Sequence, residues 1–405
     1  SARREPGARA GLEPHRKHPE TENIMYAYQR DSIYTAQAGD GLEELLAAEL
    51  TELGAENSVP GFRFVRFRAD FETLCRIVHR SRLATRILAP LIYFPCPTDR
   101  ALYGAGRDIR WTDFLNPDQT FAITANVSES RIGHSRYAAL KLKDAVADWF
   151  RDQTGRRPGV EPREPDLWLH LHIRRDRATI SVDASGGSLH RRGYRVRSVD
   201  APMQETLAAA IIRLSGWDGA CPLVDPLCGS GTLLCEALMA AGGIPAAVLR
   251  TRFGFMRLPE FQPGSWAAMC ARTSPEAERL ARAAALIRGG DRDPEAVQAA
   301  RENLARLPGG RGVSVERGDF FDRRDLAGAA IVANPPYGIR LGGNDDMGAW
   351  YKRLGDHLKR HCTGATACIY FGDRTLLKHI GLRPEWKKPL KNGGLDGRLA
   401  RFTLY

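Results

Sequence analysis

The chain has 405 residues, of which 43% are hydrophobic and 26% are charged. These fractions are typical of a folded globular protein and exclude a collagen-like or fully disordered chain. No run of about 18 apolar residues occurs, so we expect no membrane-spanning helix. The length exceeds what one hydrophobic core usually organises, which predicts two or three domains.

Eight cysteines are spread along the chain without a Cys-x-x-Cys pair. The main support for a structural zinc or dithiol site is therefore missing. His170 and His172 are two residues apart on an expected strand, but no third ligand follows nearby, so we interpret them as polar-face histidines and expect no metal. Sparse thiols and the lack of a signal-peptide pattern predict a cytoplasmic protein with reduced cysteines.

The net charge of +11 indicates a polyanionic partner, and its distribution along the chain is uneven. Residues 131–197 alone carry a net charge of +7 and end in the arginine-rich stretch 191–197. We expect this region to bind the phosphates of a nucleic acid. The alternative is a solvated linker in an arginine-rich chain. The residues that we assign to nucleic-acid contact are Lys141, Lys143, Arg191, Arg192, Arg195 and Arg197.

The first part of the chain predicts a small α+β domain over residues 25–95. Residues 1–24 are rich in Arg, Glu, Pro and His without apolar periodicity, which predicts a disordered extension. Aromatic residues alternate with arginines over residues 62–67, so we expect a half-buried strand there. The segment from Leu74 to Ile87 has the apolar spacing of a helix.

Residues 96–190 are predicted to form a second unit. Strands are expected at residues 121–127, 167–173 and 178–183. Between the first two, Leu142 to Phe150 place apolar residues on one face of a helix.

Residues 200–405 predict an α/β domain. Asp200 is expected to cap a helix that runs from Met203 to Leu214. Beyond it, short apolar runs alternate with helical segments as far as Phe371. Such alternation predicts a parallel sheet with helices on both faces.

The strongest local signal is the segment Asp225-Pro226-Leu227-Cys228-Gly229-Ser230-Gly231-Thr232, which lies between an expected strand and an expected helix. The two glycines allow the backbone to approach a ligand at the carboxyl edge of the sheet. The segment has neither the Lys of a phosphate-binding P-loop nor a complete dinucleotide fingerprint. An aspartate at the strand end suits a ligand with a cationic amino-acid group instead.

Three further signals follow at later strand ends, where doubly wound sheets bind ligands. Asp291 can accept hydrogen bonds from both hydroxyls of a ribose. Asp319 and Phe320 offer an acid for an adenine amino group and an aromatic ring for its face. The fourth signal is Asn334-Pro335-Pro336-Tyr337, after a continuous apolar run.

The Asn-Pro-Pro-Tyr segment indicates chemistry on the exocyclic amine of a base. Such an amine is a poor nucleophile because its lone pair is conjugated into the ring. The side-chain oxygen of Asn334 and a prolyl carbonyl, both held by rigid prolines, can accept its two N–H bonds. Tyr337 can then stack on a base removed from its helix.

These motifs resemble those of the class I S-adenosylmethionine-dependent methyltransferases that act on amines. More closely, the chain is similar to the THUMP-containing RNA guanine-N2 methyltransferases, a family that includes a bacterial enzyme acting on 23S ribosomal RNA. The residues that carry the resemblance are Leu102-Tyr103, Ile109-Arg110-Trp111, Lys143-Asp144-Ala145, Asp183 to Arg195, Ala201-Pro202, Asp225 to Thr232, Glu236-Ala237, Phe253-Gly254-Phe255 and Asn334 to Gly338.

The resemblance implies an α/β protein with a small α+β, ferredoxin-like domain at 25–95, a THUMP RNA-binding domain at 96–190 and a Rossmann-like methyltransferase domain at 200–405. It implies S-adenosylmethionine as cofactor and Asn334, Pro335, Pro336 and Tyr337 as catalytic residues. The residues expected to bind the cofactor are Asp225, Pro226, Cys228, Gly229, Gly231, Thr232, Asp291, Asp319, Phe320 and Asn334.

The expected reaction is methylation of a guanosine N2 amine in 23S ribosomal RNA, by a protein with an RNA partner and no membrane partner. A guanine-N2 methyltransferase of transfer RNA is the nearest alternative, since THUMP domains also occur in such enzymes. A DNA adenine methylase would use the same Asn-Pro-Pro-Tyr segment. A noncatalytic RNA-binding protein is disfavoured because Asp225, Asp291, Asp319 and Asn334 are all present.

Overall fold

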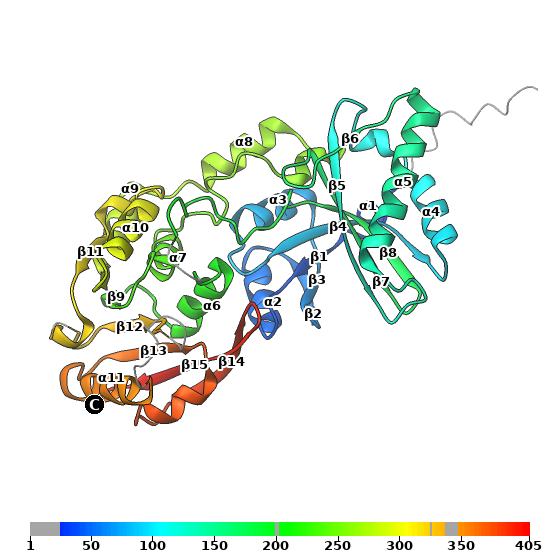
Figure 1. Ribbon diagram of the computed structural model, residues 1–405. Coiled ribbons are helices and arrows are strands. Elements are labelled where there is room, and N and C mark those ends of the chain that lie inside the picture. The colour runs from blue at the N-terminus through cyan, green and yellow to red at the C-terminus, as the bar shows by residue number, and fades with distance from the viewer. Residues whose placement is uncertain (1–24, 199–201, 325, 337–346) are drawn as a thin grey trace, which may run out of the picture.

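The computed structural model describes residues 25–198, 202–324, 326–336 and 347–405, which form two mixed sheets with their helices (Figure 1). The extension predicted at residues 1–24 lies outside this part of the chain. Within it, no helix is long and apolar enough to cross a membrane.

The first sheet has eight strands in the order β2-β3-β1-β4-β8-β7-β5-β6. They are β1 (Ile33–Gln37), β2 (Glu56–Gly61), β3 (Phe64–Arg68), β4 (Arg86–Pro95), β5 (Thr120–Ser128), β6 (Gly159–Val160), β7 (Leu167–Arg174) and β8 (Arg177–Asp183). The beginning of β4 pairs antiparallel with β1, whereas Leu88 to Pro95 pair antiparallel with β8. The two units predicted at 25–95 and 96–190 therefore share one continuous sheet.

Five helices and one 3-10 turn accompany this sheet: α1 (Ala27–Asp31), α2 (Glu43–Glu52), α3 (Phe71–Arg80), α4 (Asp99–Arg107), η1 (Trp111–Asp113) and α5 (Ser135–Thr154). Helix α3 begins at a conventional cap, since Asp70 accepts a hydrogen bond from the Thr73 amide at 2.7 Å. The prediction that this helix reaches Ile87 is wrong, because Ile87 lies in β4 opposite Ala36. After Arg86, strand β4 continues with the buried apolar run 87–91, so the spacing of apolar residues does not mark where the helix ends.

The second sheet has seven strands in the order β11-β10-β9-β12-β13-β15-β14. They are β9 (Leu223–Asp225), β10 (Ile287–Asp291), β11 (Ser314–Arg317), β12 (Ala330–Ala333), β13 (Thr366–Phe371), β14 (Trp386–Asn392) and β15 (Leu395–Thr403). Strands β9 to β13 are parallel as predicted, but β15 pairs antiparallel with β13 and β14. Sequence reasoning missed β14 because it contains Pro389 and three lysines, a composition that an edge strand tolerates.

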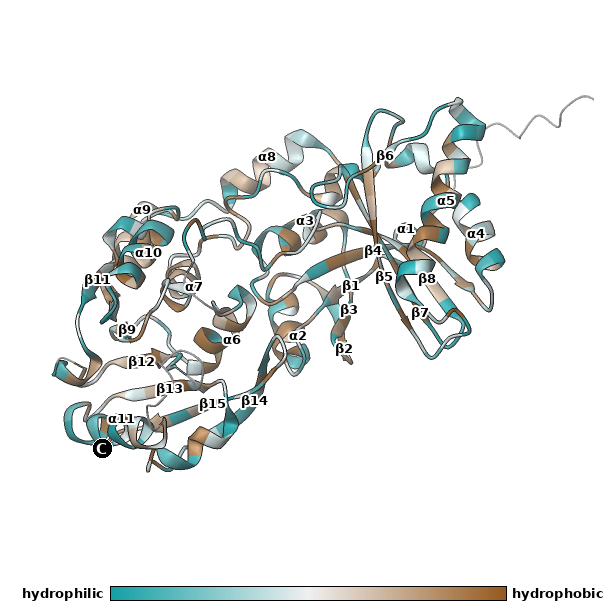
Figure 2. Cartoon of the chain, in the orientation of Figure 1, coloured by the Kyte–Doolittle hydropathy of each residue, from teal (hydrophilic) through white to brown (hydrophobic). Residues whose placement is uncertain are grey.

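The helical elements around this sheet are α6 (Glu205–Ser215), α7 (Thr232–Ala241), η2 (Gly254–Arg257), α8 (Pro263–Arg272), α9 (Ala277–Leu286), α10 (Pro294–Leu304), η3 (Gly310–Gly312), η4 (Phe320–Asp322), α11 (Met347–His361) and η5 (Arg374–His379). The larger apolar core includes α6, α7 and α10. A second core packs α11 against β12, β13 and β15. Figure 2 shows hydrophilic residues on the outward sides of α9 and α11. The expected cap residue Asp200 lies outside the described residues.

The two sheets are joined where η2 packs on the end of β8. A Cβ atom at Gly254 would lie 1.8 Å from the carbonyl oxygen of Asp183, so only glycine fits this approach. The next amide, of Phe255, donates to the Ala184 carbonyl at 2.8 Å. Trp266 of α8 packs on Phe255 with ring centroids 4.9 Å apart. This contact explains the Phe-Gly-Phe motif at 253–255 as a junction between domains.

Arg192 is the second element of this junction, and it is buried. Its guanidinium donates to the Leu189 carbonyl at 2.8 Å and pairs with Glu236 of α7 at 3.4 Å. Only 1% of the arginine side chain and none of the glutamate side chain is exposed. The assignment of Arg192 to RNA contact is therefore wrong, because no phosphate can reach this guanidinium in the folded protein.

We predict that Arg192→Ala destabilises the protein, whereas Arg191→Ala does not. Removing one partner of a buried ion pair leaves the other charge buried alone and typically costs about 3–5 kcal/mol. Arg191 is the matched control because its side chain is exposed. Thermal unfolding followed by calorimetry should give a lower Tm for Arg192→Ala alone. Equal Tm values for the two variants would contradict the structural role.

Candidate active site

The predicted site residues follow neighbouring parallel strands, so they lie along one edge of the second sheet. Strand β9, which ends at Asp225, lies between β10, which ends at Asp291, and β12, which precedes Asn334. The Gly229 amide donates to the Asp291 carboxylate at 2.9 Å, and the Cys228 amide donates to the Gly290 carbonyl at 2.9 Å. The structure thus brings these sequence-distant motifs together at the position where doubly wound sheets bind ligands.

The loop between β9 and α7 depends on two glycines with left-handed backbone conformation. Gly229 has φ of 52° and Gly231 has φ of 80°. A Cβ atom at Gly231 would also lie 3.0 Å from the Cβ atom of Ala300 on α10. The loop lines a small pocket of ≈ 40 Å³ that is partly open to solvent. Its lining residues are Pro202, Met203, Asp225, Leu227, Cys228, Gly229, Ser230, Thr232, Leu233 and Asn334.

Asp225 lies on this pocket with only 1% of its surface exposed. Burial raises its pKa to about 8, with a further contribution from the negative charge of Asp291, although the Leu227 amide donates to its carboxylate. The group is therefore largely protonated at neutral pH in the cofactor-free protein. A ligand ammonium group beside it would favour the carboxylate form.

Asp291 and Asp319 are partly exposed, and the backbone fixes the orientation of each carboxylate. The two oxygens of Asp291 accept from the amides of Gly229 and Asp293, and Asp319 accepts from the Phe321 amide at 2.8 Å. Each carboxylate keeps further lone pairs for ligand hydroxyl or amino groups. Phe320 is only 2% exposed, so no more than a small part of its ring can contact a ligand.

Asn334 lies on the same pocket as Cys228 and Gly229. Its Oδ1 atom is buried and has no hydrogen-bond partner among the residues that the structure describes. Pro335 is buried, and the carbonyl of Pro336 accepts a hydrogen bond from the Tyr351 hydroxyl of α11 at 3.3 Å. Since buried polar atoms normally have partners, an unpaired acceptor on a pocket indicates a missing ligand donor. The expected stacking residue Tyr337 lies outside the described residues.

The arginine-rich stretch differs from its prediction. Arg195 pairs with Glu205 at 3.1 Å and donates to the Thr232 hydroxyl at 3.2 Å, with 17% of its side chain exposed, so its assignment to RNA contact stays a prediction for a guanidinium that already has partners. Arg197 is half-buried and pairs with Glu295. Arg191 alone in this stretch combines an exposed side chain with the absence of an ion-pair partner among the described residues.

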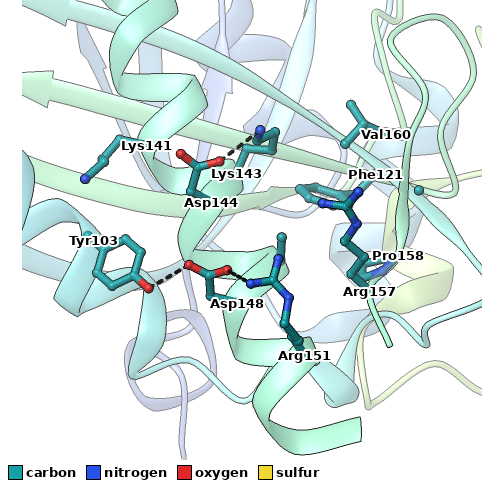
Figure 3. A pocket seen from close by; sticks show the side chains of 12 residues that line it. Tyr103, Phe121, Lys141, Lys143, Asp144, Asp148, Arg151, Arg157, Pro158 and Val160 are labelled. Atoms are coloured by element: carbon teal, nitrogen blue, oxygen red, sulfur yellow. Dashed lines mark hydrogen bonds and ion pairs between the residues drawn. The ribbon is translucent and has the colours of Figure 1, made fainter. Parts of the chain in front are cut away.

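Lys141 and Lys143 line a cavity between α5 and the segment that precedes β6 (Figure 3). Lys143 pairs with Asp144 at 2.9 Å, and the ammonium of Lys141 lies 5.2 Å from the centre of the Tyr103 ring. On the opposite wall, Arg157 is exposed and has no ion-pair partner within the described ranges. The cavity therefore presents one uncompensated guanidinium beside the two lysines.

Sequence reasoning missed two residues that support the site, Tyr351 and Asn303. Asn303 of α10 is 1% exposed and bonds to Ser230 in the glycine loop. A polar residue on the apolar face formed by Val297, Ala300 and Leu304 was the available signal. Tyr351 carries no comparable signal, because an aromatic residue on an amphipathic helix is typical of a core position.

A Rossmann-like sheet, a glycine loop after its first strand and an asparagine after its fourth define a class I methyltransferase, whose cofactor is S-adenosylmethionine. Three family models match the chain: an RlmL ferredoxin-like domain at residues 34–88, a THUMP domain at 98–183 and an RMKL-like methyltransferase domain at 192–401. The chain belongs to this RMKL-like methyltransferase family. The predicted domain types and their order are confirmed.

Individual relatives agree with this placement. A putative RNA methyltransferase of Synechocystis sp. is 37% identical over 373 residues, which cover 92% of this chain and 97% of the relative. The ribosomal RNA large subunit methyltransferase K/L of Syntrophotalea carbinolica is 39% identical over 383 residues. That match covers 92% of this chain but only 53% of the relative, so the chain spans about half of its length. A crystal structure of a putative methyltransferase complexed with S-adenosylhomocysteine (SAH) superposes on this chain with a TM-score of 0.79. The two sequences are 25% identical, and the match covers 92% of this chain and 98% of the other.

We predict that Asp225→Asn raises the Tm of the cofactor-free protein at pH 8 and that this gain shrinks towards pH 5. The folded-state pKa of about 8 exceeds the value of about 3.9 in an unfolded chain. The folded state is therefore stabilised by this proton at low pH and loses that stabilisation as the pH rises through the folded-state pKa. Asn cannot ionise, so the variant does not lose stability over this pH range. Differential scanning calorimetry at both pH values measures the effect, with the partly exposed Asp319→Asn as control. A Tm difference independent of pH would contradict the buried, protonated carboxyl.

Proposed function

We propose that the chain transfers the methyl group of S-adenosylmethionine to the N2 amine of a guanosine in 23S ribosomal RNA. The observation that carries the proposal is the unpaired, buried Oδ1 atom of Asn334 beside the cofactor loop. The ribosomal target is supported by the name of the Syntrophotalea relative, and the guanosine by the family resemblance alone. Transfer RNA and DNA adenine are the competing acceptors.

The cofactor-binding residues have the chemistry that the cofactor requires. Asp225 would face its α-ammonium group, and the backbone at Gly229 and Gly231 would contact the same end. Asp291 would accept from the ribose hydroxyls and Asp319 from the adenine amine. Pro226, Cys228, Thr232 and Phe320 complete the proposed set. When bound, the cofactor supplies an electrophilic methyl group on a positively charged sulfur.

Asn334 acts on the acceptor amine. Its Oδ1 atom accepts one N–H of the amine, and the Pro335 carbonyl accepts the other. Both bonds favour a lone pair that points at the methyl group instead of into the ring. The Tyr351 bond to Pro336 holds this segment, and Tyr337 would stack on the flipped base. The proton leaves to solvent after methyl transfer, so the mechanism needs neither a general base nor a metal.

Binding of the RNA would use exposed cations of the lobe that is built on the first sheet, and of the arginine-rich stretch 191–197 that follows this lobe and serves as its linker to the second sheet. Arg191 and Arg157 are the strongest candidates because neither is compensated by an acid among the described residues. Lys141 and Lys143 add positive charge on the cavity of Figure 3. Arg197 is a weaker candidate, since it already pairs with Glu295.

We predict opposite kinetic defects for Asn334→Ala and Asp291→Ala. Asn334→Ala should lower turnover by at least about a hundredfold with cofactor affinity nearly unchanged, since preorganised contacts to the reacting group typically contribute this much. Asp291→Ala should weaken cofactor binding by about ten- to hundredfold, through loss of charge-assisted hydrogen bonds. Calorimetric titration with SAH and single-turnover assays separate the two effects. Unchanged turnover in a folded Asn334→Ala variant would reject the proposed mechanism.

The acceptor is tested by offering tritiated cofactor with naked 23S RNA, assembled large subunits, transfer RNA and double-stranded DNA. We expect label in N2-methylguanosine of 23S RNA, and none with Asn334→Ala. Label confined to transfer RNA would overturn the ribosomal assignment. Label in N6-methyladenine would overturn the guanine assignment.

We predict that Arg157→Ala and Arg191→Ala each make RNA binding less sensitive to salt. A cation that neutralises one phosphate contributes about 0.7 to 0.9 to the slope of log affinity against log salt concentration. The control is Arg282→Ala, because Arg282 lies exposed on α9 and pairs with Glu278. Filter binding at several salt concentrations gives the slopes. Slopes equal to that of the control would exclude these two arginines from the interface.

A further inference from the structure

The linker that leaves the first sheet is tied to the cofactor loop by a single buried side chain. The Oδ1 atom of Asn303 accepts from the amides of Val196 and Arg197, at 2.9 and 3.1 Å. Its Nδ2 atom donates to the carbonyls of Arg197 and Ser230, both at 2.9 Å. Asn303 is 1% exposed, and its bond to Ser230 is fully buried, whereas the three bonds to Val196 and Arg197 are partly buried.

This arrangement uses the complete hydrogen-bonding capacity of an amide, which is two donors and two acceptor lone pairs. Three bonds go to the linker and one to the loop. No other natural side chain of this size offers both functions in the same plane. A buried polar group that is fully satisfied specifies one arrangement of its partners.

The loop carbonyl that Asn303 binds belongs to Ser230, between the two glycines with positive φ. Helix α10 also contacts the loop directly, since Gly231 has no room for a side chain beside Ala300. The position of the loop on the cofactor pocket is thus set from α10.

A second contact attaches the same linker to the other side of the pocket. Arg195 donates to the Thr232 hydroxyl at 3.2 Å and to the Met203 carbonyl at 2.9 Å. Both Thr232 and Met203 line the pocket. Residues 195–197 therefore contact the pocket wall directly through Arg195 and the glycine loop through Asn303.

We propose that Asn303 is a positioning residue that couples the linker to the cofactor loop, so that cofactor binding stabilises the linker at Val196 and Arg197. By thermodynamic linkage, an ordered linker then favours cofactor binding to the same extent. The inference rests on the proposed cofactor site but not on the identity of the methyl acceptor.

The first test uses the unaltered protein and SAH as a nonreactive probe. Hydrogen exchange is measured with and without saturating SAH. We expect slower exchange at the glycine loop and also at the amides of Val196 and Arg197. Protection that stops at the loop would overturn the coupling. If SAH fails to bind at all, the cofactor site itself is wrong and the inference fails with it.

The second test is Asn303→Asp, which keeps the size and the acceptor but replaces the donor that faces Ser230. We expect SAH affinity to fall by about ten- to hundredfold, as for loss of a buried hydrogen bond with an unsatisfied carbonyl left behind. Protection at Val196 and Arg197 on SAH binding should disappear. Turnover at saturating cofactor should stay close to that of the unaltered protein, so the defect appears in KM and not in kcat.

Glu302→Gln is the matched control. Glu302 lies next to Asn303 on α10 and pairs with Arg197 at 3.6 Å, but it does not touch the loop. We expect unchanged SAH affinity in this variant. Equal affinity in both variants would overturn the positioning role, as would a fall in kcat with unchanged KM for Asn303→Asp. Should Asn303→Asp fail to fold, the exchange experiment on the unaltered protein decides alone.

Discussion

The buried ion pair between Arg192 and Glu236 fixes how the two lobes of this protein are placed relative to each other. Glu236 lies one turn into α7, the helix that begins at the cofactor loop. Arg192 also donates to backbone carbonyls, including that of Arg82, whose own side chain bonds to the Met239 carbonyl of α7. Because separating a buried ion pair leaves each charge buried alone, a different placement of the lobes would be strongly destabilised. The RNA-binding lobe and the site are therefore held as one unit.

A fixed separation between the two lobes has a consequence for substrate choice. The cavity of Figure 3 and Arg191 lie outside the pocket at Asn334, so RNA bound there as we propose would present its target nucleotide at a set distance. The target base would also have to leave its helix to reach Asn334, at an energetic cost that depends on how well it is paired and stacked. In the proposed mechanism, Asn334 and Pro335 accept two N–H bonds, which guanine and adenine share. Selection of one nucleotide over another would therefore depend on the distance between the bound RNA and the pocket, and on how easily the target base leaves its helix.

The sequence could predict the catalytic domain because its signals are local. A glycine that must adopt positive φ, an aspartate at a strand end and an Asn-Pro-Pro turn each depend on a few consecutive residues. Burial of a charge depends instead on a partner elsewhere in the chain. Arg192 stands in a run of arginines, a pattern that is typical of an exposed surface. Its burial depends on distant partners such as Glu236, which lies 44 residues further along the chain. The role of Asn303 was hidden for the same reason, since its partners belong to two other segments.

The pocket keeps two polar groups in states that the protein alone does not stabilise. Asp225 is buried without a cation, so its pKa is raised, and the Oδ1 atom of Asn334 is buried without a donor. The ligands that we propose would supply what is missing: an ammonium group for the carboxylate and an amine N–H for the amide oxygen. Because the first is a group of the cofactor and the second a group of the methyl acceptor, the proposed reaction would run between these two unsatisfied positions.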